Sequence, residues 1–566
     1  MDARNNRPAS YSSVSRVVAF IIVVLGVLAG GSVVNADAPD ATDVALSAIK
    51  PDAIRADMRF LADDLLEGRG TGARGHLIAA HYVASQFEGM GLMPAGDSGS
   101  YFQEVPIRSS TVDESSSSAT LSFRGNAVTL KFREDYLLTS DPGRRQSDVE
   151  APVVFAGYGI TAPSQGYDDY KHIEVQGKIV AVLYGAPDWP SAIKAHFSAG
   201  WLKRQNAAAH GAVGYILVYD PALEKLYPFT EYVRDLAIPN RNWLDSGEHP
   251  NDYYSALKAV AVFSAAGAQR LLEGSGRTLD QIYAAAKAHR PPSFALAKRV
   301  HFHVETGWGD IKSPNVVAKL TGSDPVLAAE YVVYTAHLDH LGISTPVDGD
   351  SIYNGALDNA SGSAVLMEVA RAFSSMPVKP KRSMLFIAVT GEESGDLGSE
   401  YFANHPTVDK KALVANINMD EDMMLWPLED VVAIGAEHST LEGVVKRAAQ
   451  QLHLVSSPDP APEKVYFIRS DQYSFVRQGI PSLALTAGFK SDDPSISPAK
   501  IMEEWETKIY HQPQDDMQQP GMNFGAAVLY ARTAFLCGLY TANESAAPEW
   551  KPGDFFGVAY PRSSRN

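Results

Sequence analysis

Residues 331–339, YVVYTAHLD, are the stretch that decides the fold. The first six residues are mostly apolar, and their aromatic and β-branched side chains favour a strand. A nearly continuous apolar run is typical of a parallel strand that is covered on both faces. His337 and Asp339 follow at its carboxyl end, where open α/β sheets place their binding sites.

Three further apolar runs of the same character follow along the chain, at residues 383–390, 413–418 and 481–486. Between the first two strands, residues 366–373 carry apolar side chains at helical spacing, which predicts the crossover helix that parallel strands require. We therefore expect an α/β fold, a three-layer sandwich with a mainly parallel central sheet, from about Asn315 onward.

Metal-ligand side chains follow the other expected strands as well. Glu392 and Glu393 come after the second strand, Asp420 after the third, and Asp358 precedes the crossover helix. Each such group alone is usually structural or solvated, but these groups meet at one edge of one sheet. With His511 they supply two imidazoles and several carboxylates, which suit two divalent cations side by side. The set predicts a hydrolase that activates water with metal.

Composition narrows the class of protein. The chain has 566 residues with 45% hydrophobic and 20% charged side chains, which is typical of a globular protein with two or three domains. Its 49 basic and 66 acidic side chains give a net charge of −17, the wrong sign for nucleic acid. The single cysteine, Cys537, allows no intrachain disulfide.

The amino terminus has the pattern of a secretory signal peptide. An apolar run at residues 17–28 follows three arginines, and small side chains precede a predicted cleavage after Ala36. The run falls short of the roughly 20 residues that span a bilayer as a helix, so an uncleaved anchor is the less favoured alternative. We expect no later stretch to be apolar enough to cross a bilayer. We expect an exported protein, periplasmic or secreted, without stable membrane insertion.

The residue pattern also predicts a separate module in the first half of the chain. Between residues 149 and 292, short β-rich runs surround a helical stretch at 192–209. The predicted divisions are a signal peptide at 1–36, the first part of the catalytic domain at 37–148, the inserted module at 149–292, the main catalytic domain at 293–545 and a tail at 546–566.

Five short motifs, in this order and spacing, resemble the co-catalytic di-zinc aminopeptidases, the family that also includes glutamate carboxypeptidase. The motifs are His337-x-Asp339, Asp358-Asn359-x-Ser361-Gly362, Gly391-Glu392-Glu393, Asn418-x-Asp420 and Tyr510-His511. An upstream segment, residues 66–72, resembles the first segment of that family. The stretch 149–292, with Gly157-Tyr158-Gly159, looks like the protease-associated domain inserted in many members. The resemblance implies a zinc-exopeptidase-like sandwich plus an inserted, β-rich α+β protease-associated domain.

The resemblance also implies a metal centre with assigned ligands. His337 and Asp420 would hold one zinc ion, Glu393 and His511 the other, and Asp358 would bridge the two. The expected cofactor is two Zn²⁺ per chain, although Co²⁺ or Mn²⁺ can occupy similar sites.

Three more positions receive catalytic roles from the resemblance. Glu392 would be the general base, and Asp339 would accept a hydrogen bond from the second ring nitrogen of His337 and fix its tautomer. The hydroxyl of Tyr510 would assist the oxyanion, with simple packing as the alternative. The chain departs from the family at Gln472, where Ser-Asp-His is often found, and this leaves the contacts on the substrate side open.

Two other polar groups are expected to be structural. The acidic run 420–422 could anchor the terminal ammonium of a substrate, but a solvated turn is the favoured interpretation. His301 and His303 alternate in a β-like run, and we expect no acidic partner near them.

The resulting hypothesis is an exported zinc aminopeptidase that acts on peptides. A carboxypeptidase of the glutamate-carboxypeptidase type is the first alternative, and it needs basic side chains in the pocket, which the sequence does not place. A glutaminyl cyclase is a transferase alternative, and a non-catalytic binding protein on the same fold is the alternative from another class. The preferred residue, the native metal and the oligomeric state are left open.

Overall fold

The predicted parallel strands form the centre of a mixed sheet in the computed structural model, which describes residues 40–236 and 238–562. In spatial order they are β17 (Ser383–Val389), β14 (Tyr331–His337), β18 (Leu413–Met419) and β21 (Ser482–Ala487). Antiparallel pairings extend the sheet on both sides, through β13 (Ser293–Leu320) and β2 (Phe102–Val112) on one and β19 (Asp430–Ile434) on the other. The mainly parallel centre is confirmed. The predicted signal peptide lies outside the described residues.

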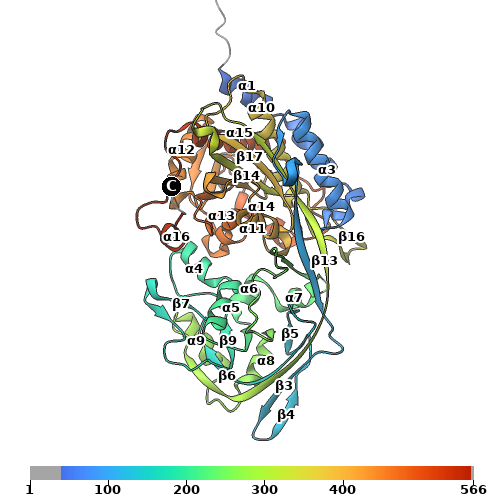
Figure 1. Cartoon of the computed structure of the whole chain (residues 1–566), viewed down its shortest axis with the longest axis vertical. Coiled ribbons are helices and arrows are strands. Elements are labelled where there is room, and N and C mark those ends of the chain that lie inside the picture. Colours follow the sequence, from blue (N-terminus) through green and yellow to red (C-terminus); the bar gives the residue numbers. More distant parts are fainter. Residues whose placement is uncertain (1–39, 237, 563–566) are drawn as a thin grey trace, which may run out of the picture. The chain divides into compact units, whose positions relative to one another are not determined.

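Helices cover both faces of this sheet, which explains why its central strands are apolar throughout. One face packs in a large core with α2 (Pro51–Leu61), α3 (Arg74–Gly89), the predicted crossover helix α10 (Gly362–Ser375), α12 (Leu441–Gln451) and α15 (Phe524–Asn543). The other face packs against α11 (Leu397–Asn404) and α13 (Gln472–Val476). Figure 1 shows the two helical layers around the labelled strands. The three-layer sandwich is therefore confirmed.

A single strand of 28 residues, β13 (Ser293–Leu320), belongs to this sheet and to a second one. In spatial order the second sheet contains β4 (Asn126–Thr129), β3 (Ser118–Phe123), the first half of β13, β6 (Gln146–Ala156), β9 (Ile179–Leu183), β10 (Gly214–Val218), β12 (Val260–Phe263) and β5 (Tyr136–Leu138). We call this sheet and its helices the inserted module.

The inserted module starts earlier and ends later than its predicted limits of 149 and 292. Strands β3 to β5, which the sequence pattern placed in the first part of the catalytic domain, pair within the second sheet. The other end extends into β13, which pairs with β6 as far as Glu305. The boundary is hidden in the sequence because β13 passes from one sheet to the other without a break.

The helices of the inserted module lie between its strands in the chain. They are α4 (Ser191–Ser198), α5 (Gly200–Ala209), α6 (Pro221–Leu226), α7 (Phe229–Asp235), α8 (Ala265–Leu272) and α9 (Leu279–Lys287). The single helix predicted at 192–209 is two helices, because Ala199 has an extended ψ of 128° that ends α4.

Smaller elements complete the described chain. They are α1 (Ala41–Ala48), β1 (Met93–Pro94), β7 (Thr161–Ala162), β8 (Tyr167–Asp168), β11 (Asn240–Trp243), β15 (Gly342–Val347), β16 (Asp350–Tyr353), β20 (Val455–Ser457), α14 (Pro498–Lys508) and α16 (Phe555–Ala559). The last helix anchors the predicted tail, because Phe556 is fully buried against Phe467 and Tyr473.

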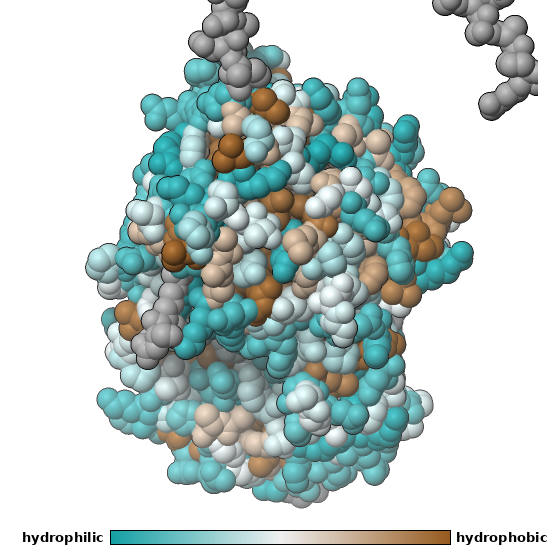
Figure 2. Space-filling view, turned by 45° about the horizontal axis from the view of Figure 1, so that its top comes forward, coloured by the Kyte–Doolittle hydropathy of each residue, from teal (hydrophilic) through white to brown (hydrophobic). Residues whose placement is uncertain are grey.

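Helix α15 corrects one expectation about membranes. In length and composition it could cross a bilayer, and among the described residues it is the one helix that could. However, 72% of its most apolar window is buried inside the protein, and its side chains pack in the core below the sheet. The apolar run of α15 is thus used in packing. Figure 2 shows a largely hydrophilic face with apolar groups in small scattered patches.

Candidate metal centre

The predicted ligands come together at the carboxyl edge of the central sheet. His337 ends β14, Glu392 and Glu393 lie in the turn after β17, and Asp420 follows β18. Asp358 lies in the turn Ala356–Ser361 that precedes α10. His511 follows α14. Five separate segments therefore contribute to one site.

His337, Asp358 and Asp420 form the first group of metal-ligand atoms, which all lie within 4.8 Å of one another. The Nε2 atom of His337 is 3.0 Å from Oδ1 of Asp420 and 3.2 Å from Oδ1 of Asp358. Burial lowers the pKa of His337, but Asp420 and Asp358 outweigh it and raise the pKa well above its usual value. The imidazole thus lies where a positive charge is favoured.

The second group shares Asp358 and contains an imidazole that sequence analysis missed. His340, Asp358 and Glu393 lie within the same 4.8 Å limit, and Nδ1 of His340 is 2.5 Å from Oε1 of Glu393. The predicted ligand His511 is also close, with Nε2 3.2 Å from both Oδ2 of Asp358 and Oε2 of Glu393. The signal for His340 was its position in the loop after β14, three residues beyond His337.

The donor set fits two zinc ions that share one carboxylate. Each group offers imidazole nitrogen and carboxylate oxygen, the ligands of catalytic zinc sites. Oδ2 of Asp358 is buried and has no hydrogen bond of good geometry among the described residues, although Nε2 of His511 lies 3.2 Å and Nδ1 of His340 3.7 Å from it. A buried carboxylate oxygen without a donor is costly, and a cation at this position would remove that cost.

Asp515 holds the loop that carries Asp358, a role that no local sequence pattern marks. Its Oδ1 accepts hydrogen bonds from the main-chain N–H of Leu357 (2.9 Å) and the amide of Gln519 (2.7 Å). Its Oδ2 accepts one from the N–H of Asp358 at 3.0 Å. Asp515 is fully buried, so these bonds fix the position of the shared carboxylate.

Arg69, from the segment that resembles the first family motif, braces the site from behind. Its guanidinium is fully buried and donates to the main-chain oxygens of Leu338 (2.8 Å), Asn354 (2.6 Å), Gly355 (2.9 Å) and Leu61. Burial lowers its pKa to about 10. The loop after β14 and the loop before Asp358 are thereby tied together by one side chain.

Asp339 orients the neighbouring Glu392 rather than His337. Its Oδ1 accepts the main-chain N–H of Glu392 at 3.2 Å, and its Oδ2 accepts the hydroxyl of Thr71 at 2.8 Å. Nδ1 of His337 lies 3.1 Å from the main-chain oxygen of Asp339 but 4.0 Å from Oδ1. The tautomer of His337 is therefore set by a peptide carbonyl, as often happens around metal ligands.

Glu392 is partly buried beside the two groups of metal-ligand atoms. The turn that carries it begins at Gly391. Gly391 has a φ of +70°, and a Cβ there would lie 3.0 Å from Cβ of Leu397, so this turn requires glycine. Burial, with help from Asp396 and Asp420, raises the pKa of Glu392 well above its usual value despite the opposing effect of His337. A carboxyl group that holds protons readily suits a general base.

Two other predicted positions pack around the site. Tyr510 stacks on His511 with ring centroids 3.9 Å apart, so its ring supports that imidazole. Gln472 is fully buried, accepts a hydrogen bond from Asn418 (3.1 Å) and donates to the main-chain oxygen of Phe467 (3.1 Å). Its amide is used within the fold, and this gives the departure from Ser-Asp-His a structural role.

Two expectations about polar side chains are wrong. The acidic run after β18 is not a solvated turn, because Asp422 is only 2% exposed and burial raises its pKa to about 6. His301 and His303 do have an acidic partner, since both ring systems lie 3.1 Å from Asp148 on the adjacent strand β6. A partner across a sheet cannot be found from sequence spacing.

Comparison with known proteins agrees with this site. Residues 315–531 match Peptidase family M28. The chain is 41% identical over 106 residues to a "Probable zinc metalloprotease" of Pyrenophora teres f. teres, covering 19% of this chain and 22% of that protein. It is 29% identical over 197 residues to Aminopeptidase YwaD of Bacillus subtilis, covering 33% and 36%. In both cases the chain spans less than two thirds of the relative's length.

A solved structure supports the fold over most of the chain. An aminopeptidase from Aneurinibacillus sp. strain AM-1 superposes with a TM-score of 0.50 at 18% identity, covering 92% of this chain and 100% of that one. At this identity the likeness concerns the fold alone, and the α/β sandwich described above is what the two chains share.

Proposed function

We propose that this chain, whose residues 315–531 match Peptidase family M28, is a di-zinc aminopeptidase that releases residues from the amino end of peptides. The observation that carries the proposal is the pair of ligand groups joined by Asp358, with Glu392 beside them. The described relatives named as a zinc metalloprotease and an aminopeptidase support the reaction class. Both ligand groups and the proposed general base are present, which argues against a binding protein that has lost catalysis.

The side chains around the site divide the work of peptide hydrolysis. Bound zinc would supply a Lewis acid that polarises the scissile carbonyl and lowers the pKa of water. Glu392 accepts the proton of the attacking water and returns it to the leaving amine. Asp339 holds the main chain of Glu392, and Tyr510 supports the ring of His511. These contacts keep the reacting groups in register.

Activity measurements on the mature chain test this proposal. We expect release of amino acids from aminoacyl-anilides and short peptides, loss of release after exhaustive chelation, and recovery on adding zinc. Glu392→Gln keeps the shape of the side chain but removes the base, so kcat should fall by about 10²–10⁴-fold. Glu503→Gln, on the exposed side of α14, is the matched control. Full activity of Glu392→Gln, or after chelation, would refute the mechanism.

One observation favours a carboxypeptidase as the second candidate. Arg469 places a positive charge near the site. Burial lowers the pKa of its guanidinium, but Tyr510, Tyr466, Glu421 and Glu392 outweigh this effect and raise it. A guanidinium there could pair with a terminal carboxylate. Arg477 is not available for this role, since it is bound to Glu400 at 2.7 Å. Peptides blocked at the amino end should resist an aminopeptidase, whereas peptides blocked at the carboxyl end should resist a carboxypeptidase.

We also propose that the protein is exported, on the basis of the signal-like pattern before Ala36. Fractionation of cells that express the full chain, followed by amino-terminal sequencing of the exported form, tests this. A mature chain that begins at Asp37 would support export, and an intact amino terminus inside the cell would contradict it.

A further inference from the structure

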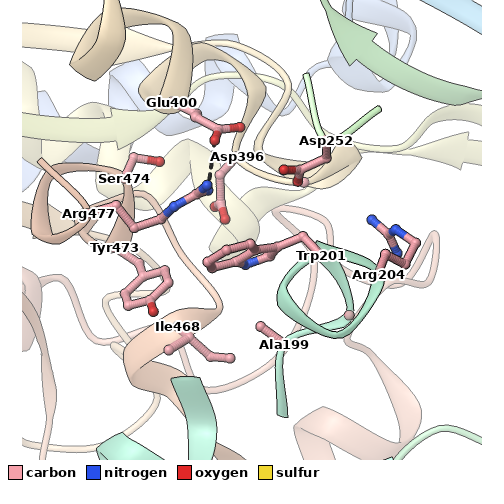
Figure 3. A pocket seen from close by; sticks show the side chains of 12 residues that line it. Ala199, Trp201, Arg204, Asp252, Asp396, Glu400, Ile468, Tyr473, Ser474 and Arg477 are labelled. Carbon is pink, nitrogen blue, oxygen red and sulfur yellow. Dashed lines mark hydrogen bonds and ion pairs between the residues drawn. The ribbon is translucent and has the colours of Figure 1, made fainter. Parts of the chain in front are cut away.

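A cavity of about 340 Å³ lies between the inserted module and the catalytic sandwich. The module contributes Trp201, Arg204 and Asp252, and the sandwich contributes Asp396, Glu400 and Arg477. Figure 3 shows these side chains around the central ring of Trp201. The volume is within the range of small-ligand sites and suits one long side chain. The cavity thus has the size and the polar lining of a binding site.

Two of the charged side chains in the cavity lining, Glu400 and Arg477, form an ion pair with each other. Glu400 pairs with Arg477 at 2.7 Å and also accepts hydrogen bonds from the indole of Trp243 (3.0 Å) and the amide of Asn251 (2.8 Å). Arg477 in turn lies 4.1 Å from the centroid of the Trp201 ring. These contacts join the module to the sandwich and leave no net charge.

The other two acidic side chains are not part of this pair. Within the ranges 40–236 and 238–562, neither Asp252 nor Asp396 has an ion-pair partner, and Oδ1 of Asp396 is shielded from solvent without a hydrogen bond. In Figure 3 the carboxylates of Asp396 and Asp252 lie on the same side of Trp201. A shielded carboxylate without a partner is costly, and a donor cation from a ligand would satisfy it.

The shape of the lining favours a cation on an apolar stem. The cavity is lined by three acidic side chains and two guanidiniums. Burial, with Asp471 and Glu400, raises the pKa of Asp396 well above its usual value, and a cation beside this group would favour its ionised form. The faces of Trp201 and Tyr473 and the side chain of Ile468 offer apolar contact. Lysine and arginine combine an alkyl stem with a charged head, and both bind well over aromatic rings.

The cavity shares its walls with the metal centre. The main-chain N–H of Asp396 donates to the oxygen of Glu392 at 3.0 Å, so the cavity begins one turn beyond the general base. Ile468 and Tyr473 flank Ser470, whose hydroxyl donates to Asp420 at 2.6 Å. The segments that carry Glu392 and Ser470 therefore also line the cavity.

We propose that this cavity binds the side chain of an arginine or lysine in the peptide substrate, at a position beyond the residue that is released. Asp396 and Asp252 bind the charged head, and Trp201 packs on the stem. The link to catalysis rests on the proposed peptidase function, whereas the binding of a basic side chain does not.

A binding experiment tests the cavity without any need for activity. N-acetyl-arginine amide and its neutral citrulline counterpart are titrated by calorimetry into the full mature chain after metal removal. The arginine ligand should bind at least about tenfold more tightly, because a charge-assisted hydrogen bond is lost with citrulline. Asp396→Asn and Asp252→Asn, one on each side of the cavity, should each weaken arginine binding by about tenfold. Asp188→Asn, an exposed position of the module, should leave it unchanged.

Three outcomes of that titration would overturn the proposal. The first is equal binding of the citrulline ligand, and the second is arginine binding that neither aspartate variant alters. The third is tighter binding of N-acetyl-glutamate amide, titrated in the same way, which would make Arg204 the partner of the ligand. Melting curves of both aspartate variants show whether they fold, and since the two lie on different elements, one folded variant is sufficient for the test.

Kinetic measurements then distinguish a failure of the cavity proposal from a failure of the proposed peptidase function. Peptides with a leucine first and arginine or citrulline at the second, third or fourth position are compared. The arginine peptide should have the lower KM at one of these positions, with similar kcat, and Asp396→Asn should abolish the difference. If leucine is not released from any peptide, the proposed function fails while the titration still decides the cavity. If release occurs without any arginine preference, the cavity proposal fails alone.

Discussion

Replacing Asp515 by asparagine should weaken zinc binding although this residue touches no metal. The carboxylate accepts three hydrogen bonds, from the N–H groups of Leu357 and Asp358 and from Gln519. Asparagine keeps one acceptor oxygen, so at least one buried donor will face an NH₂ group. Each charge-assisted bond is worth about 1.5–3 kcal/mol. Burial raises the pKa of Asp515, so removing the charge offsets part of this loss.

We expect a net cost of about 2 kcal/mol, which corresponds to roughly 30-fold weaker zinc binding and lies within the usual effect of residues that orient metal ligands. The assay is titration of zinc into metal-free protein against a fluorescent chelator. Hydrogen exchange adds a local measure, since a peptide covering residues 355–362 should exchange faster in the variant.

The adjacent Asp516 provides a matched control, because it is only partly buried and its Oδ1 accepts the N–H of Gln518. Asp516→Asn should bind zinc as the wild type does. The reasoning is refuted if Asp515→Asn has the same zinc affinity as Asp516→Asn, or if affinity falls without any change in exchange of the 355–362 loop.

Three further perturbations follow from the same geometry. His511→Ala should reduce bound zinc from two equivalents to one, whereas His340→Ala should keep two equivalents at roughly 10–100-fold lower affinity. Metal analysis after dialysis distinguishes the two variants. The reverse pattern would make His340 the ligand in place of His511. Arg69→Met should cost about 4 kcal/mol in the free energy of unfolding, because it leaves buried carbonyls unpaired; urea unfolding should show no such loss for the exposed Arg74→Met. Burial raises the pKa of Asp57 from 3.8 to about 6, so the stability that this group contributes is full below pH 3.8 and is lost as the pH rises through 6. The free energy of unfolding of Asp57→Asn relative to wild type should therefore rise by on the order of 3 kcal/mol between pH 4 and pH 7, and a pH-independent difference would contradict it.

The centre of the fold could be predicted because buried parallel strands have a strong local pattern. The runs beginning at Tyr331, Ser383 and Leu413 became β14, β17 and β18 with the same first residues. The ligands could be placed with them, since each follows a strand whose carboxyl end lies at one edge.

What could not be predicted depends on contacts between distant segments. Asp515 binds main-chain groups about 157 residues away, and no local pattern marks that role. Asp148 pairs with His301 across a sheet, so their separation in sequence conceals the pair. The module boundary was missed for a related reason, since an unbroken strand carries no signal of the sheet to which it belongs.

That unbroken strand has a mechanical consequence. Because β13 is hydrogen-bonded into both sheets, and β2 pairs with it across the crossing from Thr306 to Val316, the module is joined to the sandwich by a continuous two-stranded ribbon. A module connected by a flexible loop could rotate through changes in a few backbone dihedral angles. This ribbon is hydrogen-bonded, so it can move the module only by bending along its length. The module should behave as a stiff lever, so that a small flexure of the ribbon would change the width of the gap between Trp201 and Asp396.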